Sequence, residues 1–190
     1  MVLETPNKPI KYCYFIESGF ASIVAAGGNG KRLEVGLIGR EGVTGLSVVL
    51  GHDRSPNETF IQAEGEGQRI SASDLRNAME QSRILERTLV RYAHAFVDQA
   101  STTAFANGTL SLEQRLARWL LLAADRLDGK SLPLTHEFLS LMLGVRRAGV
   151  TTALNLLEQS GLIKLSRKQI ELVDRRGLID ATAGAYRPSK

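Results

Sequence analysis

The sequence predicts an α+β fold in which an antiparallel β domain comes first, a long helix follows, and a helical domain with a strand pair ends the chain. Residues 12–70 hold short β-branched and aromatic runs separated by Gly-rich turns, which is typical of a small antiparallel barrel or sandwich. Helical periodicity then runs from about residue 84 to residue 105. The predicted units are a β domain at 1–82, a long helix at 83–107 and a third domain at 108–180.

The composition is that of an ordinary globular protein. The chain has 190 residues, of which 43% are apolar and 23% charged, so it can bury a sizeable core. No stretch approaches the ~18 to 20 apolar residues of a membrane span, and the first twelve residues lack the apolar segment of a signal peptide. Cys13 is the single cysteine, which excludes an internal disulfide and fits a reducing cytoplasm. We therefore expect a cytoplasmic protein with no membrane partner.

Positive charge is concentrated in the second part of the chain. Residues 1–110 hold 11 Lys/Arg and 12 Asp/Glu, whereas residues 111–190 hold 13 and 8, a net of +5. A neutral part joined to a basic part indicates that the second part meets a polyanion such as nucleic acid. The alternative is a soluble domain that is merely basic.

Turn signals place the strands of the β domain. Asn29-Gly30 separates two apolar runs and predicts a hairpin, because both central residues of a type I′ turn need positive φ. A second tight turn is predicted at Glu17-Ser18-Gly19, and "FIQAEGEGQRIS" alternates as a half-buried strand does.

The long helix carries an apolar stripe whose spacings alternate between four and three residues. Such a stripe is typical of a helix that packs lengthwise on a second helix, and we predict that it pairs two copies of the chain. The alternative is that the stripe packs on the chain's own sheet. We expect the helix to break at Asn107-Gly108. The residues assigned to the dimer contact are Leu85, Leu89, Tyr92 and Phe96.

Two short helices joined by a Gly-containing turn follow. Thr135 is placed to cap a helix over "HEFLSLML", Gly144 lies in the turn, and Arg146 opens a second helix that Gly161 ends. This spacing indicates a helix-turn-helix. The second helix has an apolar back, with Val150, Leu154 and Leu157, and a polar front, with Arg146, Arg147, Thr151, Thr152 and Asn155.

The polar front suits the edges of DNA bases. An arginine can form a bidentate pair with guanine O6 and N7, worth about 1–3 kcal/mol of discrimination, and threonine can contact a thymine methyl or a phosphate. The next segment, "LIKLSRKQIELVD", predicts a two-stranded wing whose tip presents Arg167 and Lys168 to the phosphate backbone. A generic helical hairpin with a β-ribbon and solvated charges is the alternative.

On these residues the sequence resembles the Crp/Fnr-type transcription regulators. "LTHEFLSLMLGVRRAGVTTALNLLEQSGLI" is similar to the family's helix-turn-helix, "LEQRLARWLLLAADR" to the helix before it, and "YCYFIESGFASIVAAGGNGKRLEVGLIGREG" to its sensor hairpin. The resemblance implies an antiparallel β-roll like that of cyclic-nucleotide-binding domains, a long dimerisation helix and a winged helix-turn-helix. It implies base or phosphate contacts for Arg146, Arg147, Thr151 and Thr152, and a phosphate contact for Thr135. It also implies double-stranded DNA, a second copy of the chain and RNA polymerase as partners.

The sequence departs from the family in its sensor region. Gly45 stands where the family has the glutamate that holds a ribose hydroxyl, and Arg54-Ser55 precedes Pro56, which removes a backbone donor. We therefore expect no cyclic nucleotide, and the ligand clusters of the haem and iron–sulfur members are absent. The effector stays open. Only about eleven residues precede the first matching strand, so we expect an incomplete roll with an exposed edge, with further strands encoded upstream. Ala148 replaces a common glutamate and changes the expected half-site.

Other chemistries find little support. "GGNGKR" lacks the Walker A spacing, since Arg32 occupies the Ser/Thr place, and three scattered histidines make no metal site. No nucleophile–base pair is present, so we expect no enzyme and no cofactor. The sequence predicts a homodimeric, sequence-specific DNA-binding regulator that reads a near-palindromic operator. The alternative is a sensor module whose winged helix binds protein.

Overall fold

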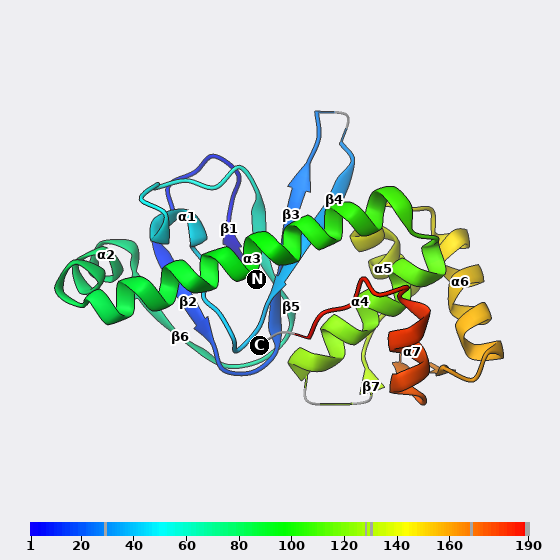
Figure 1. Cartoon of the computed structure of the whole chain (residues 1–190). Coiled ribbons are helices and arrows are strands. Elements are labelled where there is room, and N and C mark those ends of the chain that lie inside the picture. The colour runs from blue at the N-terminus through cyan, green and yellow to red at the C-terminus, as the bar shows by residue number, and fades with distance from the viewer. Residues whose placement is uncertain (29, 128, 130, 168, 189–190) are drawn as a thin grey trace.

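The structure, a computed structural model, describes residues 1–28, 30–127, 129, 131–167 and 169–188. Strands dominate the first part, and a short helix interrupts them (Figure 1). In chain order the first elements are β1 (Val2–Glu4), β2 (Tyr12–Ile16), β3 (Phe20–Ala26), β4 (Arg32–Ile38), α1 (Leu46–Val49), β5 (Glu58–Ala63), β6 (Gly67–Ser71) and α2 (Ala72–Gln81).

Helices dominate the second part. The remaining elements are α3 (Arg83–Thr109), α4 (Leu112–Leu127), β7 (Ser131–Leu132), α5 (His136–Leu143), α6 (Arg147–Gln159), β8 (Ile163–Ser166), β9 (Gln169–Leu172) and α7 (Arg175–Ala181). Along the described residues, no helix combines the length and the apolar character needed to cross a membrane. The predicted α+β fold is confirmed.

The β domain consists of a four-stranded and a two-stranded antiparallel sheet. Their orders are β1-β5-β3-β4 and β2-β6. The predicted hairpin is the β3–β4 pair, in which Ala26 lies opposite Arg32 and Gly30 has φ +75°. Asn29, the other turn residue, lies outside the described residues. The predicted turn at Gly19 is also present, with φ +73°.

The N-terminal residues contribute a strand that their sequence pattern does not predict. β1 pairs with β5, and Val2 lies opposite Phe60. The side chain of Glu4 at the end of β1 is buried, and its Oε1 accepts a hydrogen bond of 2.8 Å from the Gly45 backbone N–H. One edge that we expected to be exposed is therefore covered by the chain's own first residues.

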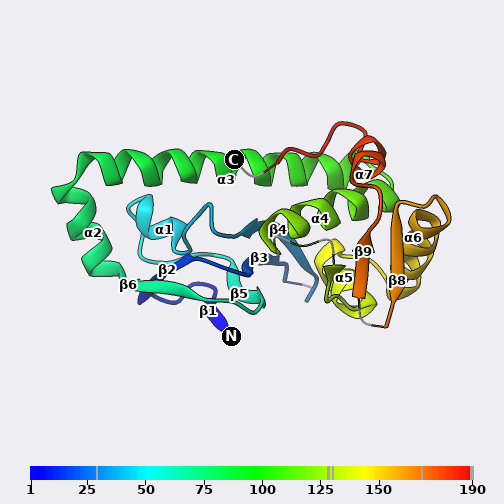
Figure 2. The ribbon, with the colours of Figure 1, turned by 90° about the horizontal axis from the view of Figure 1, so that it is seen from below.

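α3 spans both parts of the molecule and corrects two predictions. Figure 2 shows it running alongside the β domain and on to the C-terminal helices. The helix continues through Asn107 and Gly108 to Thr109, because Ala106 is buried and the Thr109 hydroxyl bonds the Phe105 carbonyl at 2.8 Å. A glycine near a helix end costs only about 1 kcal/mol, which such contacts can offset.

The second correction concerns the stripe assigned to the dimer contact. Leu89 is 5% exposed and packs with Leu85 and Tyr92 against α1, α2 and β2, while Phe96 packs beside the β-sheet. The stripe therefore faces the chain's own β domain, which was the alternative. Leu89 is fully enclosed there, whereas Leu85, Tyr92 and Phe96 keep part of their surface exposed.

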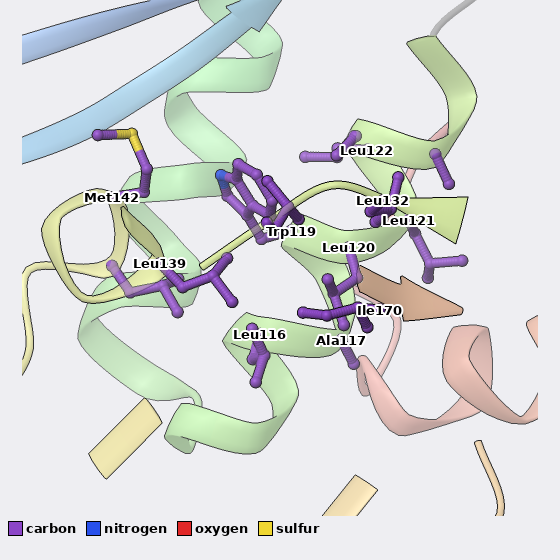
Figure 3. Packing of buried hydrophobic residues seen from close by; sticks show 14 of the residues in the cluster. Leu116, Ala117, Trp119, Leu120, Leu121, Leu122, Leu132, Leu139, Met142 and Ile170 are labelled. Atoms are coloured by element: carbon purple, nitrogen blue, oxygen red, sulfur yellow. The ribbon is translucent and has the colours of Figure 1, made fainter. Parts of the chain in front are cut away.

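The largest apolar cluster joins the two parts. α4 supplies more of it than any other element, including Leu116, Leu120 and Leu121, which have no exposed surface. Figure 3 shows Trp119 of α4 on the side of Leu139 and Met142 of α5, and Leu121 on the other side, near Leu132. The Trp119 ring also meets Phe20 of β3 edge-on, with the ring centroids 6.4 Å apart. The β-sheet and the C-terminal helices thus share one core.

A buried carboxylate lies at this junction. Glu34 on β4 is 5% exposed, and it accepts hydrogen bonds from Ser22 Oγ at 2.7 Å and from Trp119 Nε1 at 2.6 Å. Burial raises the pKa of Glu34 to about 7, although the two hydrogen bonds and the charges of Arg126 and Arg118 oppose the rise. This contact connects the β3–β4 hairpin to α4.

Candidate DNA-binding surface

α5 and α6 form two helices joined by a tight turn. Gly144 ends α5 with φ +65°, and its N–H bonds the Leu141 carbonyl. Arg146 has extended backbone angles, φ −72° and ψ 144°, and serves as the N-cap residue from which α6 starts at Arg147. The predicted helix therefore begins one residue later than expected. At its other end, Gly161 has φ +72° and lets the chain turn into β8.

α6 has two distinct faces. Its back consists of Val150, Ala153, Leu154 and Leu157, which pack into the large core with at most 4% exposure. Its front is exposed at Arg146, Arg147, Ala148, Thr152 and Asn155. Because the back is held rigidly against α4 and α5, the front presents its polar groups in a fixed orientation.

Arg146 and Arg147 point free guanidinium groups outward. Neither side chain has a hydrogen bond or ion pair with any residue that the structure describes. The first turn of α6 carries no acidic residue that would repel an anion. The helix N-terminus adds free N–H groups and the positive end of the helix dipole, so this end attracts phosphate or base acceptor atoms.

The two threonines of α6 differ in their availability. Thr151 is half-buried, and its hydroxyl contacts the Arg147 carbonyl at 3.2 Å and His136 Nδ1 at 2.9 Å. Thr152 is exposed, and its hydroxyl bonds only the Ala148 carbonyl, at 3.1 Å. Thr152 can therefore reach a partner, whereas Thr151 connects α6 to the start of α5.

Thr135 lies at the exposed start of α5. Its Oγ1 accepts a hydrogen bond from the Phe138 N–H at 3.2 Å, as the capping pattern predicts. The hydroxyl hydrogen remains available to donate to a phosphate. Thr135 and the start of α6 thus lie in the same motif.

The wing is a three-stranded sheet with the order β7-β9-β8. The predicted strand pair is present, with Leu165 opposite Ile170, and β7 adds a third strand that the sequence analysis missed. Arg167 is exposed at the β8–β9 turn. Lys168 lies outside the described residues.

Two contacts that orient this surface were not found from the sequence. The Arg115 guanidinium on α4 donates to the Leu143 carbonyl at the end of α5, which fixes the turn. The Glu158 carboxylate near the end of α6 accepts from the Leu165 N–H at 2.6 Å, which ties the wing to the helix. Neither contact can be predicted from a local sequence pattern, because each joins residues of separate helices or strands.

Comparisons with known proteins agree with this geometry. Residues 114–181 match the family model of the Crp-like helix-turn-helix domain. No curated protein sequence matches the chain. TTHB099, a CRP-family transcriptional regulator from Thermus thermophilus, superposes with a TM-score of 0.82 at 16% identity, covering 99% of this chain and 96% of its own. FixK2 from Bradyrhizobium japonicum superposes with a TM-score of 0.82 at 19% identity, covering 95% of this chain and 92% of its own.

The chain has the Crp/Fnr architecture. Residues 114–181 of its C-terminal part match the Crp-like helix-turn-helix model, and the resemblance stated from the sequence is confirmed. The fold class, with an antiparallel β domain before the helix-turn-helix, is confirmed as well.

In the region that corresponds to the family's sensor, the chain's own side chains surround Gly45. Gly45 has φ +77°, and a Cβ there would collide with Cys13 Sγ, so the position excludes the family's glutamate side chain. The Gly45 N–H is taken by Glu4, as described above. Arg54 is exposed and contacts Asp53 at 3.5 Å and the Asn7 carbonyl at 3.2 Å. Burial also raises the pKa of Cys13 to about 12, which keeps its thiol protonated.

Proposed function

We propose that this protein is a homodimeric, sequence-specific DNA-binding transcription regulator. The observation that carries the proposal is the pair of unpartnered guanidinium groups of Arg146 and Arg147 at the exposed start of a helix whose back is buried. A helix that enters the major groove needs this combination of a rigid back and free donors at its N-terminal end. The Crp-like helix-turn-helix match supports the same conclusion.

The proposed contacts divide into two kinds. Arg147 and Thr152 face base edges, with Arg146 at the helix start within reach of either a base or a phosphate. Thr151 supports α6 through His136. Thr135 and the wing tip, Arg167 with Lys168, contact phosphates on either side and set the register on the duplex.

A different face of α3 is proposed as the dimer seam. Val90, Val97 and Phe105 are 45%, 55% and 56% exposed, and they recur at intervals of seven and eight residues along α3. Such spacing places them on one side of a helix, which a second copy of α3 could cover. Two recognition helices related by this seam would lie about 34 Å apart and read a near-palindrome.

The effector of the proposed regulator is not a cyclic nucleotide. The carboxylate of Glu4 occupies the Gly45 N–H, at the position where the family's glutamate would hold the ribose of such a ligand. We propose no metal or redox cofactor and no catalysis. The lone buried thiol of Cys13 suits the cytoplasm, and RNA polymerase is the further partner expected of a DNA-bound regulator.

The experiment is a selection of binding sites from random DNA with purified protein, followed by anisotropy titrations at several salt concentrations. Affinity should fall steeply with salt, because phosphate contacts release counterions. Arg147→Ala should cost about 1–3 kcal/mol at one base step and flatten preference there, whereas Arg167→Ala should weaken all sequences alike and reduce the salt slope by about 1.

Arg176→Ala, an exposed arginine on α7 outside the surface, is the matched control and should change neither quantity. If binding were independent of salt, or if all three variants behaved alike, the winged helix would be better explained as a protein-binding module.

A further inference from the structure

A cavity lies where α3, α4, the loop after β4 and the C-terminal segment meet. Its volume is about 270 Å³, near the lower end of small-molecule sites. α3 contributes Tyr92 and Phe96, and α4 contributes Arg118 and Arg126. Glu41, from the loop after β4, and Arg187, from the C-terminal segment, also line the cavity. The cavity is separate from the DNA-binding surface and from the region around Gly45.

One of the two buried arginines has its charge balanced. Arg126 Nη2 lies 2.6 Å from Glu41 Oε1, and its other hydrogen bonds go to the carbonyls of Leu122 and Leu37. Only 1% of its side chain is exposed. This pair anchors α4 to the loop after β4 and leaves no net charge there.

The other buried arginine has no such partner. Arg118 is 6% exposed, and it donates to the Ala185 carbonyl at 3.0 Å and to Thr103 Oγ1 at 3.2 Å, both of which are neutral. No carboxylate among the described residues forms an ion pair with it. Burial lowers the pKa of Arg118 to about 10, with the charge of Glu34 opposing that change. A buried guanidinium is normally paired with a carboxylate in direct contact, and Arg118 has none, because Glu34 acts on it only from beyond ion-pair distance.

The mouth of the cavity adds a second free cation. Arg187 is exposed and has no hydrogen bond or ion pair with any described residue. Asp98 is the remaining carboxylate among the described lining residues, and it lies 3.8 Å from His94 on the same helix. After the Arg126–Glu41 pair is set aside, the described lining holds two arginines and one aspartate.

We propose that this cavity binds a small organic anion: a carboxylate placed between Arg118 and Arg187, with an apolar or aromatic body against Tyr92 and Phe96. The anion supplies the charge that Arg118 lacks, and the two rings remove its body from water. Anion binding by this cavity does not depend on the proposed DNA-binding function. Because the lining comes from the loop after β4, α3, α4 and the C-terminal segment, an occupant would contact both the β domain and the helices of the C-terminal part.

Benzoate and its neutral analogue benzamide test the proposal by calorimetric or ligand-observed NMR titration of the full chain. Benzoate should bind in the millimolar range or better, and benzamide about tenfold more weakly, because a hydrogen bond to a charged group is lost. Arg187→Gln should weaken benzoate by about tenfold as well. Ala95→Phe, at an exposed position on the lining, should fill the cavity and abolish binding.

Arg83→Gln, a distant exposed arginine at the start of α3, is the control and should bind benzoate as the unaltered chain does. Three results would overturn the proposal: no benzoate binding by the folded chain in the millimolar range, equal binding of benzoate and benzamide, or unchanged binding by Ala95→Phe. None of these measurements involves DNA, so failure here is distinguishable from failure of the regulator proposal.

Discussion

Replacing Glu34 by glutamine should remove a pH dependence that this buried carboxyl imposes on stability. Burial raises the pKa of Glu34 from 4.5 to about 7 in the folded chain. The folded state therefore binds the proton more tightly than the unfolded state, and the associated stability is present below pH 4.5 and lost as pH rises through 7. A shift of this size corresponds to about 3 kcal/mol over that window, at about 1.4 kcal/mol per pKa unit.

Glutamine preserves the shape and both hydrogen bonds. Its carbonyl can accept from Trp119 Nε1 and its amide can donate to Ser22 Oγ. The difference in unfolding free energy between Glu34→Gln and the unaltered chain should therefore be small at about pH 5 and should favour the variant by about 3 kcal/mol at about pH 8. Subtracting the unfolding free energies of the two proteins removes the contributions of the other titrating groups, because both proteins share them. Urea denaturation at a series of pH values measures it.

The chain also carries its own reporter of this titration. Trp119 is the only tryptophan, and its indole N–H donates directly to Glu34. Its fluorescence in the folded state should change with a midpoint near pH 7, and Glu34→Gln should abolish the change. Glu80→Gln, an exposed carboxylate on α2, is the matched control. A flat difference in unfolding free energy from about pH 5 to about pH 8 would refute the reasoning.

Three further predictions concern single contacts. Leu154→Ala should lower the unfolding free energy by about 2–5 kcal/mol in denaturant titrations, because it empties a fully buried position behind the recognition face. Thr135→Ala should cost about 1 kcal/mol through the lost cap of α5, and Thr135→Ser, which keeps the hydroxyl, should cost much less. Val97→Asp should convert the dimer to monomers in sedimentation experiments. Val173→Asp changes an equally exposed valine outside α3 and should leave the dimer intact. If the unaltered chain is a monomer, the proposed dimer seam is wrong.

The local features of this fold could be predicted because their signals lie within a few residues. Apolar periodicity placed the buried back of α6. Gly144 marked the end of α5 and Gly161 the end of α6, because each has positive φ. The exposed position of Arg147 followed from the same helical period. All of these depend on backbone preferences that neighbouring residues determine.

The partner of a helix face could not be predicted in this way. The stripe that contains Leu89 has the spacing of a dimer seam, but a helix packed on its own sheet needs the same spacing. The exposed apolar face of α3 was not predicted from the sequence, because the charged residues Arg87 and Arg91 flank Val90. The contact between Glu34 and Trp119 joins residues 85 positions apart, so no sequence window contains both.

The buried carboxyl and the cavity should influence each other through Arg118. The charge of Arg118 lowers the pKa of Glu34, so an anion that neutralises Arg118 should raise it. Because such coupling is reciprocal, protonation of Glu34 should strengthen anion binding by the same factor. Benzoate affinity should therefore fall as pH rises through 7, while benzamide affinity stays constant. In Glu34→Gln the benzoate affinity should lose this pH dependence, and a dependence that survives the substitution would place the coupling elsewhere.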